Sequence, residues 1–141
     1  MKQRNRLFVI IAVLFAASAL TIAADDLVQL PGINADDQHV KGCIDCHGAS
    51  GDNDYRLNVS LKGISGHPPI DAIVKTLPND CTMCHKAGAK AGALSTLIHK
   101  AHYANPAENH FIASYQGQCL ECHSLNLTTG VMTVKSGPKN W

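Results

Sequence analysis

The sequence contains three copies of one chemical pattern, in which two cysteines separated by two residues are followed directly by a histidine. Both thiols of such a pair can add to the vinyl groups of one porphyrin, and the adjacent imidazole can then ligate the iron. This pattern is the C-x-x-C-H signature of covalent c-type haem attachment. The three copies run from Cys43 to His47, from Cys81 to His85 and from Cys119 to His123.

All six cysteines of the 141-residue chain belong to these motifs, so we expect three haem c groups with one cysteine pair each. The expected attachment residues are Cys43 and Cys46, Cys81 and Cys84, and Cys119 and Cys122, and the expected proximal iron ligands are His47, His85 and His123.

Disulfides and zinc are the two alternative uses of six cysteines. Disulfide formation competes with thioether formation, because a thiol bonded to a porphyrin is no longer free to pair. Structural zinc requires four closely grouped nitrogen or sulfur ligands, whereas the chain offers three separate Cys-Cys-His sets. Both alternatives are disfavoured.

Five of the eight histidines lie outside the motifs, which is enough to give each of three irons a second imidazole. Iron with two histidine ligands has no open position for a substrate, so this ligand set favours electron transfer over chemistry at the metal. The candidate distal ligands are, in order of preference, His99, His102, His67, His39 and His110.

Local sequence sets this order. His99 and His102 are three residues apart on a predicted helix, so one rigid element is able to present both to neighbouring irons. His67 directly precedes Pro68-Pro69, whose fixed backbone restricts the direction of the imidazole.

The remaining candidates have weaker local support. His39 is four residues before Cys43, too near to fold easily over the haem of its own motif but able to reach another. His110 adjoins a polar connection. Met132 is an alternative axial ligand that would raise the potential, although a methionine in the tail more often packs, and Met83 lies inside a motif.

The first 24 residues have the features of a signal peptide. Three basic residues precede an apolar run over residues 7–20, and Ile22-Ala23-Ala24 forms a small-residue cleavage site. We expect cleavage there and a periplasmic or extracellular protein of residues 25–141 in a single domain. A retained N-terminal anchor that faces the periplasm is the alternative.

The charge of the exported part differs from that of the whole chain. The chain has 12 Lys and Arg against 11 Asp and Glu, and three of the basic residues precede residue 24, which leaves 9 against 11. A net charge of −2, made more negative by haem propionates, disfavours nucleic acid or an anionic membrane as a partner.

We expect a mainly α and irregular fold, with short helices and loops wrapped around three haems and little β structure. Apolar spacing predicts one helix after Pro68-Pro69, over residues 70–77, and another over Gly92 to Tyr103. Residues 48–66 are rich in Gly, Asn, Asp and Ser, which predicts a loop. Alternating apolar residues around Thr129-Gly130 predict a small hairpin in the tail.

Two runs resemble one family, the low-potential multihaem c-type cytochromes of anaerobic respiratory bacteria. Leu97-Ile98-His99-Lys100-Ala101-His102 is similar to the His-Lys-x-His element of triheme and tetraheme c3- and c7-type cytochromes and of outer-membrane decahaem cytochromes. The resemblance implies that His99 and His102 ligate different haems. His39-Val40-Lys41-Gly42-Cys43 is similar to a segment whose histidine serves a neighbouring haem.

Together these features predict an electron carrier that relays single electrons through three bis-histidine haems, with redox proteins as donor and acceptor and no small-molecule substrate. Two alternatives remain open. A spare histidine that ligates a haem of the next subunit would produce a self-associating filament. An iron left five-coordinate would make the protein a small reductase.

Overall fold

The computed structural model describes residues 28–141, and the predicted signal peptide at 1–24 lies outside the described residues. Within the described part, no helix has the length and apolar character needed to cross a membrane. The elements are short, and in chain order they are α2 (Cys43–Cys46), β1 (Ala49–Ser50), β2 (Asn53–Asp54), α3 (Leu57–Ser60), η1 (Leu61–Gly63), β3 (Thr76–Leu77), η2 (Asn79–Met83), α4 (Leu94–Tyr103), α5 (His110–Tyr115), η3 (Cys119–Glu121), β4 (His123–Leu125), β5 (Met132–Val134) and β6 (Gly137–Pro138).

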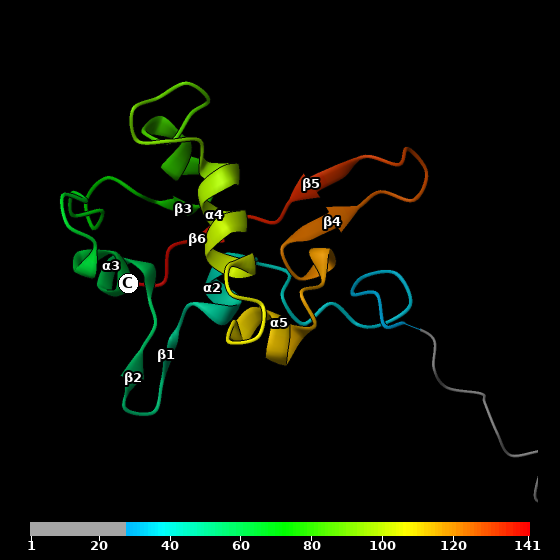
Figure 1. Ribbon diagram of the computed structural model, residues 1–141. Coiled ribbons are helices and arrows are strands. Elements are labelled where there is room, and N and C mark those ends of the chain that lie inside the picture. Colours follow the sequence, from blue (N-terminus) through cyan, green and yellow to red (C-terminus); the bar gives the residue numbers. More distant parts are fainter. Residues whose placement is uncertain (1–27) are drawn as a thin grey trace, which may run out of the picture.

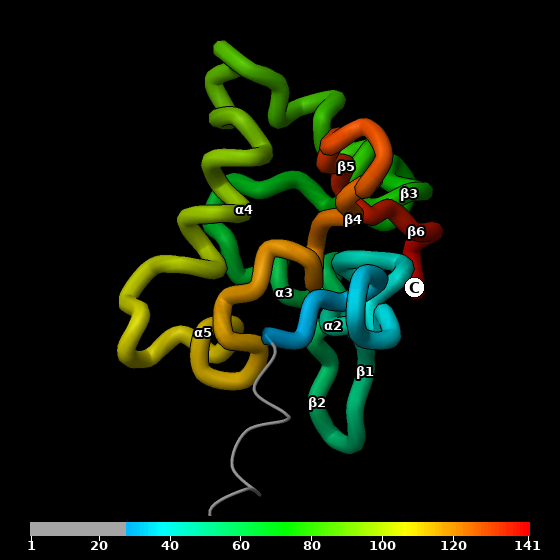
Figure 2. The backbone as a smooth tube through the Cα atoms, turned by 90° about the vertical axis from the view of Figure 1, so that its right-hand side faces the viewer, coloured from blue at the N-terminus to red at the C-terminus, as the bar shows by residue number. Residues whose placement is uncertain are grey.

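Three two-stranded antiparallel ladders connect these elements. The pairs β1–β2 and β4–β5 are local hairpins, whereas β3 pairs with β6, so the middle of the chain meets its C-terminal end. The β4–β5 hairpin reaches outward from the body, and α4 is the longest helix in the described region (Figure 1). The C-terminal end lies close to α2 and β6 in the view turned by 90° (Figure 2).

The hydrophobic core is small. Ile70, Val74 and Leu77 form its buried centre, and Leu77 is 1% exposed. The partly buried residues packed against this centre include two motif cysteines, and they are Cys43, Ile44, Leu57, Leu61, Cys81 and Trp141. The core therefore joins the first two motifs to the C-terminal residue.

The prediction of a helix after Pro68-Pro69 is wrong, since the structure has none over residues 70–77. The backbone makes a single turn, in which the amides of Ile73 and Val74 both donate to the carbonyl of Ile70. Leu77 then enters β3 and pairs with Gly137. Of the four residues with helical apolar spacing, Ile70, Val74 and Leu77 are buried, whereas Ile73 is 51% exposed. Pairing with the C-terminal segment replaces helical hydrogen bonds.

The loop predicted for residues 48–66 is partly wrong, since it contains the β1–β2 hairpin, α3 and η1. The helix predicted over Gly92 to Tyr103 begins two residues later, at Leu94, whose amide donates to the carbonyl of His85. The structure also has the C-terminal hairpin. Its turn is held by Asn126, whose side-chain oxygen accepts from the amides of Thr128 and Thr129.

Candidate metal centres

Each C-x-x-C-H motif begins in one short helical turn: α2, η2 and η3 contain the first cysteine of the first, second and third motif. In the first two motifs the histidine amide donates to the carbonyl of the residue four positions earlier, from His47 to Cys43 and from His85 to Cys81. This turn brings the histidine next to the first cysteine of its motif, which is the arrangement that attachment and ligation by one motif require.

Every motif histidine lies next to one histidine from outside the motifs, and no histidine is used twice. The three distances between ring centroids are nearly equal. The pairs are His47 with His102 at 6.0 Å, His85 with His67 at 6.1 Å and His123 with His99 at 6.1 Å.

These distances are close to the separation that two imidazoles bound to one iron would have. A ligating nitrogen lies about 2 Å from a transition metal and about 1.2 Å from its ring centre, so two ligating rings have centroids roughly 6.4 Å apart. The relative orientation of the rings differs between pairs. The planes are 7° apart for His99 and His123 and 13° for His67 and His85, but 88° for His47 and His102.

Backbone carbonyls engage the Nδ1 atom of four of these rings. The distances to the carbonyl oxygens are 2.9 Å for His67 to Pro68 and for His102 to Ile98, and 3.3 Å for His47 to Tyr55. His85 Nδ1 lies 3.1 Å from the Ala91 oxygen. A carbonyl only accepts, so Nδ1 carries a proton, and in the neutral form of such a ring the lone pair that a metal needs is on Nε2.

The surroundings of His47 also favour its neutral imidazole. Burial lowers the pKa of His47, and the neighbouring His102 lowers it further, although the hydrogen bond to the Tyr55 carbonyl acts in the opposite direction. A metal ligand must be deprotonated at the ligating nitrogen. His47 is therefore held in the form that ligation requires.

All six cysteines are free thiols. Burial raises the pKa of Cys43 to about 11, and nearby Cys122 and Cys81 raise it further. Thiols from all three motifs therefore lie close enough to interact. Burial likewise raises the pKa of Cys46, Cys81 and Cys122, which keeps these groups protonated near neutral pH.

Helix α4 supplies partners to two motifs. His99 is next to His123 of the third motif, and His102 is next to His47 of the first. Phe111 of α5 contacts the His102 ring edge-on, with centroids 5.4 Å apart and planes at 85°. Since α4 is a single rigid element, it fixes the spacing between the first and third histidine pairs.

The other two candidate ligands have no motif histidine beside them. His39 lies between the first and third motifs, with Nδ1 3.7 Å from Cys46 Sγ and Nε2 3.3 Å from Glu121 Oε2. The contact with Glu121 lacks hydrogen-bond geometry. His110 is exposed, and its Nδ1 lies 3.1 Å from Ser114 Oγ.

The structure also places Met132, the alternative axial ligand, and Met83 of the second motif. Met132 belongs to β5 and pairs across the hairpin with Leu125. Met83 lies in η2 and is 56% exposed.

A buried ion pair beside the motifs was missed by sequence reasoning. Lys135 Nζ lies 2.7 Å from Asp37 Oδ1 and 2.6 Å from the Leu120 carbonyl oxygen, and the lysine side chain is 2% exposed. The ion pair joins Asp37, which precedes the first motif, to Leu120 of the third motif. Because Asp37 and Lys135 are 98 residues apart in sequence, no local pattern identifies the pair.

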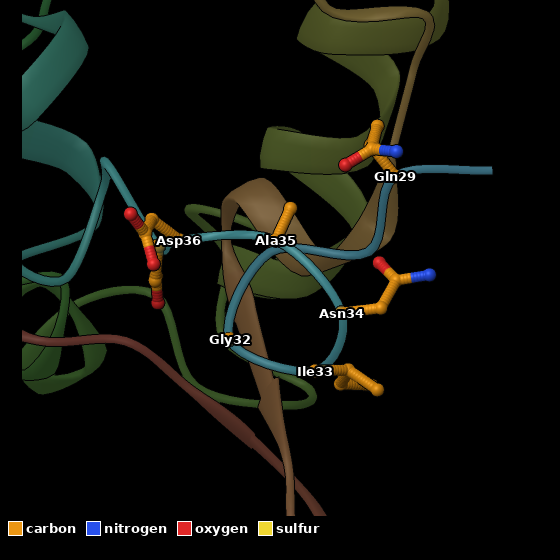
Figure 3. Close-up of a pocket in the computed structure, with 7 residues that line it drawn as sticks. Gln29, Gly32, Ile33, Asn34, Ala35 and Asp36 are labelled. Carbon is orange, nitrogen blue, oxygen red and sulfur yellow. The ribbon is translucent and has the colours of Figure 1, made fainter. Parts of the chain in front are cut away.

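Two further features of the described residues bear on metal or ligand binding. Residues 28–141 contain no group of three or more His, Cys, Asp or Glu side chains able to hold a bare metal ion. A hollow lies along the N-terminal loop and is lined by residues 29 and 32–37 (Figure 3). Its lining contains no histidine or cysteine, and one of its two carboxylates, Asp37, is already paired with Lys135.

Comparisons with protein-family models, with curated proteins and with solved structures found no match to this chain.

Proposed function

We propose that the protein is an electron-transfer protein that binds three haem c groups, each attached by one C-x-x-C-H motif and closed by two histidines. The observation that carries the proposal is the one-to-one pairing of His47, His85 and His123 with His102, His67 and His99, at centroid distances of 6.0 to 6.1 Å.

The residues fit this cofactor in two further respects. Attachment would need unpaired cysteines, whose S–H adds across a vinyl C=C to form one C–S and one C–H bond, and all six cysteines are free. Ligation needs Nε2 lone pairs, and the carbonyl contacts at Nδ1 leave them available.

When bound, haem iron supplies a one-electron ferric–ferrous couple. The chain would contribute the ligands, fix their orientation through backbone carbonyls and place the three sites close together. The shared helix α4 sets the distance between two of them. Two imidazoles on each iron leave no position for a substrate, which supports a carrier over a reductase.

The same pairing supports ligation within one chain. A filament joined by a histidine from the next subunit would need a motif histidine whose partner is missing, and each of the three has a partner in its own chain. Export to the periplasm or beyond is part of the proposal and depends on residues 1–24.

The proposal is tested on protein matured in cells that attach haem c. Haem content per chain should be three after denaturation, and a redox titration should take up three electrons reversibly at negative potentials. Fewer than three haems, or midpoints well above zero, would contradict the proposal. A C81A/C84A variant serves as the control, because it should lose one haem only.

A further inference from the structure

The β4–β5 hairpin has two chemically different faces, and one of them carries the histidine of the third motif. Its register pairs His123 with Val134, Ser124 with Thr133 and Leu125 with Met132. Directly paired residues of an antiparallel ladder lie on the same face, and successive residues alternate between faces. His123, Leu125, Met132 and Val134 therefore share one face, and Ser124 and Thr133 share the other.

We infer that the face with His123 is the apolar wall of the third haem site, against which the porphyrin attached at Cys119 and Cys122 packs. The inference rests on the proposed function. It assigns Leu125, Met132 and Val134 a role in binding this haem, in addition to the ligands and the two cysteines.

Position supports this assignment. The wall begins at the motif itself, since His123 is the first residue of β4. The amide of Lys135 donates to the carbonyl of Cys122 at 2.9 Å, which closes the ladder onto the attachment residue. The His123 ring meets His99 of α4, so the wall is on the side of the hairpin that faces the second ligand.

The exposure and polarity of the hairpin side chains also support an apolar wall for the third haem. Met132 is 49% and Val134 is 51% exposed, and neither belongs to the hydrophobic core cluster. The residues behind them, Ser124 and Thr133, are polar, as expected for a face in contact with water. An apolar face that also presents an iron ligand suits a flat, largely apolar porphyrin, whose contact area would be removed from water.

An apolar wall would influence the reduction potential of the third haem as well as its binding. Apolar side chains near an iron site exclude water and lower the local dielectric, which disfavours the form with the higher charge. The residues of this face would therefore raise the potential of the third haem relative to a wet site. Replacing one by a polar residue of the same shape should lower that potential.

The direct test is NMR of the ferrous holoprotein. The porphyrin ring current should shift the Val134 and Met132 methyl signals strongly upfield, with nuclear Overhauser contacts to a haem, while the Thr133 methyl stays in its ordinary range. Matched substitutions add a second readout. Val134→Thr should lower one of the three midpoints, and Thr133→Val, the reverse exchange on the opposite face, should move none.

The outcomes separate this inference from the proposed function. If three low-spin haems are attached but the Val134 and Met132 methyl signals are unshifted, the inferred haem contact of this face is wrong. The proposed electron-transfer function would not be affected by that result. Equal shifts in midpoint potential in Val134→Thr and Thr133→Val would also contradict the inferred haem contact. Loss of the third haem from the native protein would overturn both.

Discussion

The rings of His47 and His102 lie 6.0 Å apart with their planes at 88°, whereas the two other histidine pairs are nearly parallel. Two contacts fix the orientation of His102, namely its Nδ1 bond to the Ile98 carbonyl at 2.9 Å and the edge-on ring of Phe111. The first site is therefore set apart from the other two by the backbone of α4 and by the packing of α5.

Crossed imidazoles should give the first site its own magnetic signature. Parallel ligand planes split the iron d orbitals and produce a rhombic low-spin signal, while perpendicular planes leave two orbitals nearly degenerate and produce a more anisotropic one. We expect electron paramagnetic resonance of the ferric protein to show two classes of signal in a ratio of one to two. Three signals of one class would contradict the observed ring angles.

Removal of one distal histidine should open one iron only. In the proposed ligation, His99→Ala would remove the sixth ligand from the iron held by His123, so one of the three ferric irons should become high-spin and its midpoint should rise. Absorption and resonance Raman spectra measure this change. His110→Ala is the matched control, because His110 has no motif histidine beside it and all irons should stay low-spin. A high-spin iron in the control instead would refute the pairing.

Gly42 should tolerate no side chain. It has φ of 63°, and a Cβ built on it would lie 2.8 Å from the backbone oxygen of Lys135. Gly51 has a similar φ of 56°, with nothing within 4 Å of such a Cβ. In both alanine variants the left-handed backbone should lower the free energy of unfolding by about 1 to 2 kcal/mol. Gly42→Ala should lose clearly more in denaturant unfolding of the holoprotein, and equal losses would show that the contact with Lys135 is unimportant.

The ion pair between Asp37 and Lys135 should make stability depend on acid pH. Burial raises the pKa of Asp37, but the hydrogen bond and charge of Lys135 and the amide of His39 outweigh it and lower the pKa below 3.8. A carboxyl with a lowered folded pKa stabilises the protein above its unfolded pKa. That stabilisation disappears as the pH falls through the folded value.

Asp37→Asn tests this pair. It leaves the buried Lys135 ammonium without its counterion and should cost about 3 kcal/mol, the lower end for buried pairs because Asp37 is partly exposed. The free energy of unfolding should differ less between pH 7 and pH 3 in this variant than in the unsubstituted protein. Exposed Asp36 provides the control as Asp36→Asn, and an equal loss in that variant would speak against the ion pair.

The features that depend on short stretches of sequence were predictable. The three motifs, the helix with His99 and His102, and His67 before two prolines were all visible as short patterns, and the structure places these three histidines beside the motif histidines. Which histidine meets which motif was not predictable, because the pairing depends on how α4 packs between segments distant in sequence.

Long-range contacts account for what was missed. Ile70, Val74 and Leu77 have helical spacing, yet Leu77 pairs with Gly137 in a strand, and that partner is 60 residues away. The burial of Lys135 depends on Asp37, 98 residues earlier. A lysine in a tail predicts exposure by default, so only the folded arrangement identifies it as a buried charge.

The central claim is that three irons are each ligated by two histidines of the same chain. Near-infrared magnetic circular dichroism of the ferric holoprotein tests it most directly, because the energy of the charge-transfer band identifies the pair of axial ligands and its intensity counts them. We predict the bis-histidine band alone, with the intensity of three irons per chain in monomeric protein. A histidine–methionine band, a high-spin band, or the intensity of fewer than three bis-histidine irons would contradict the claim.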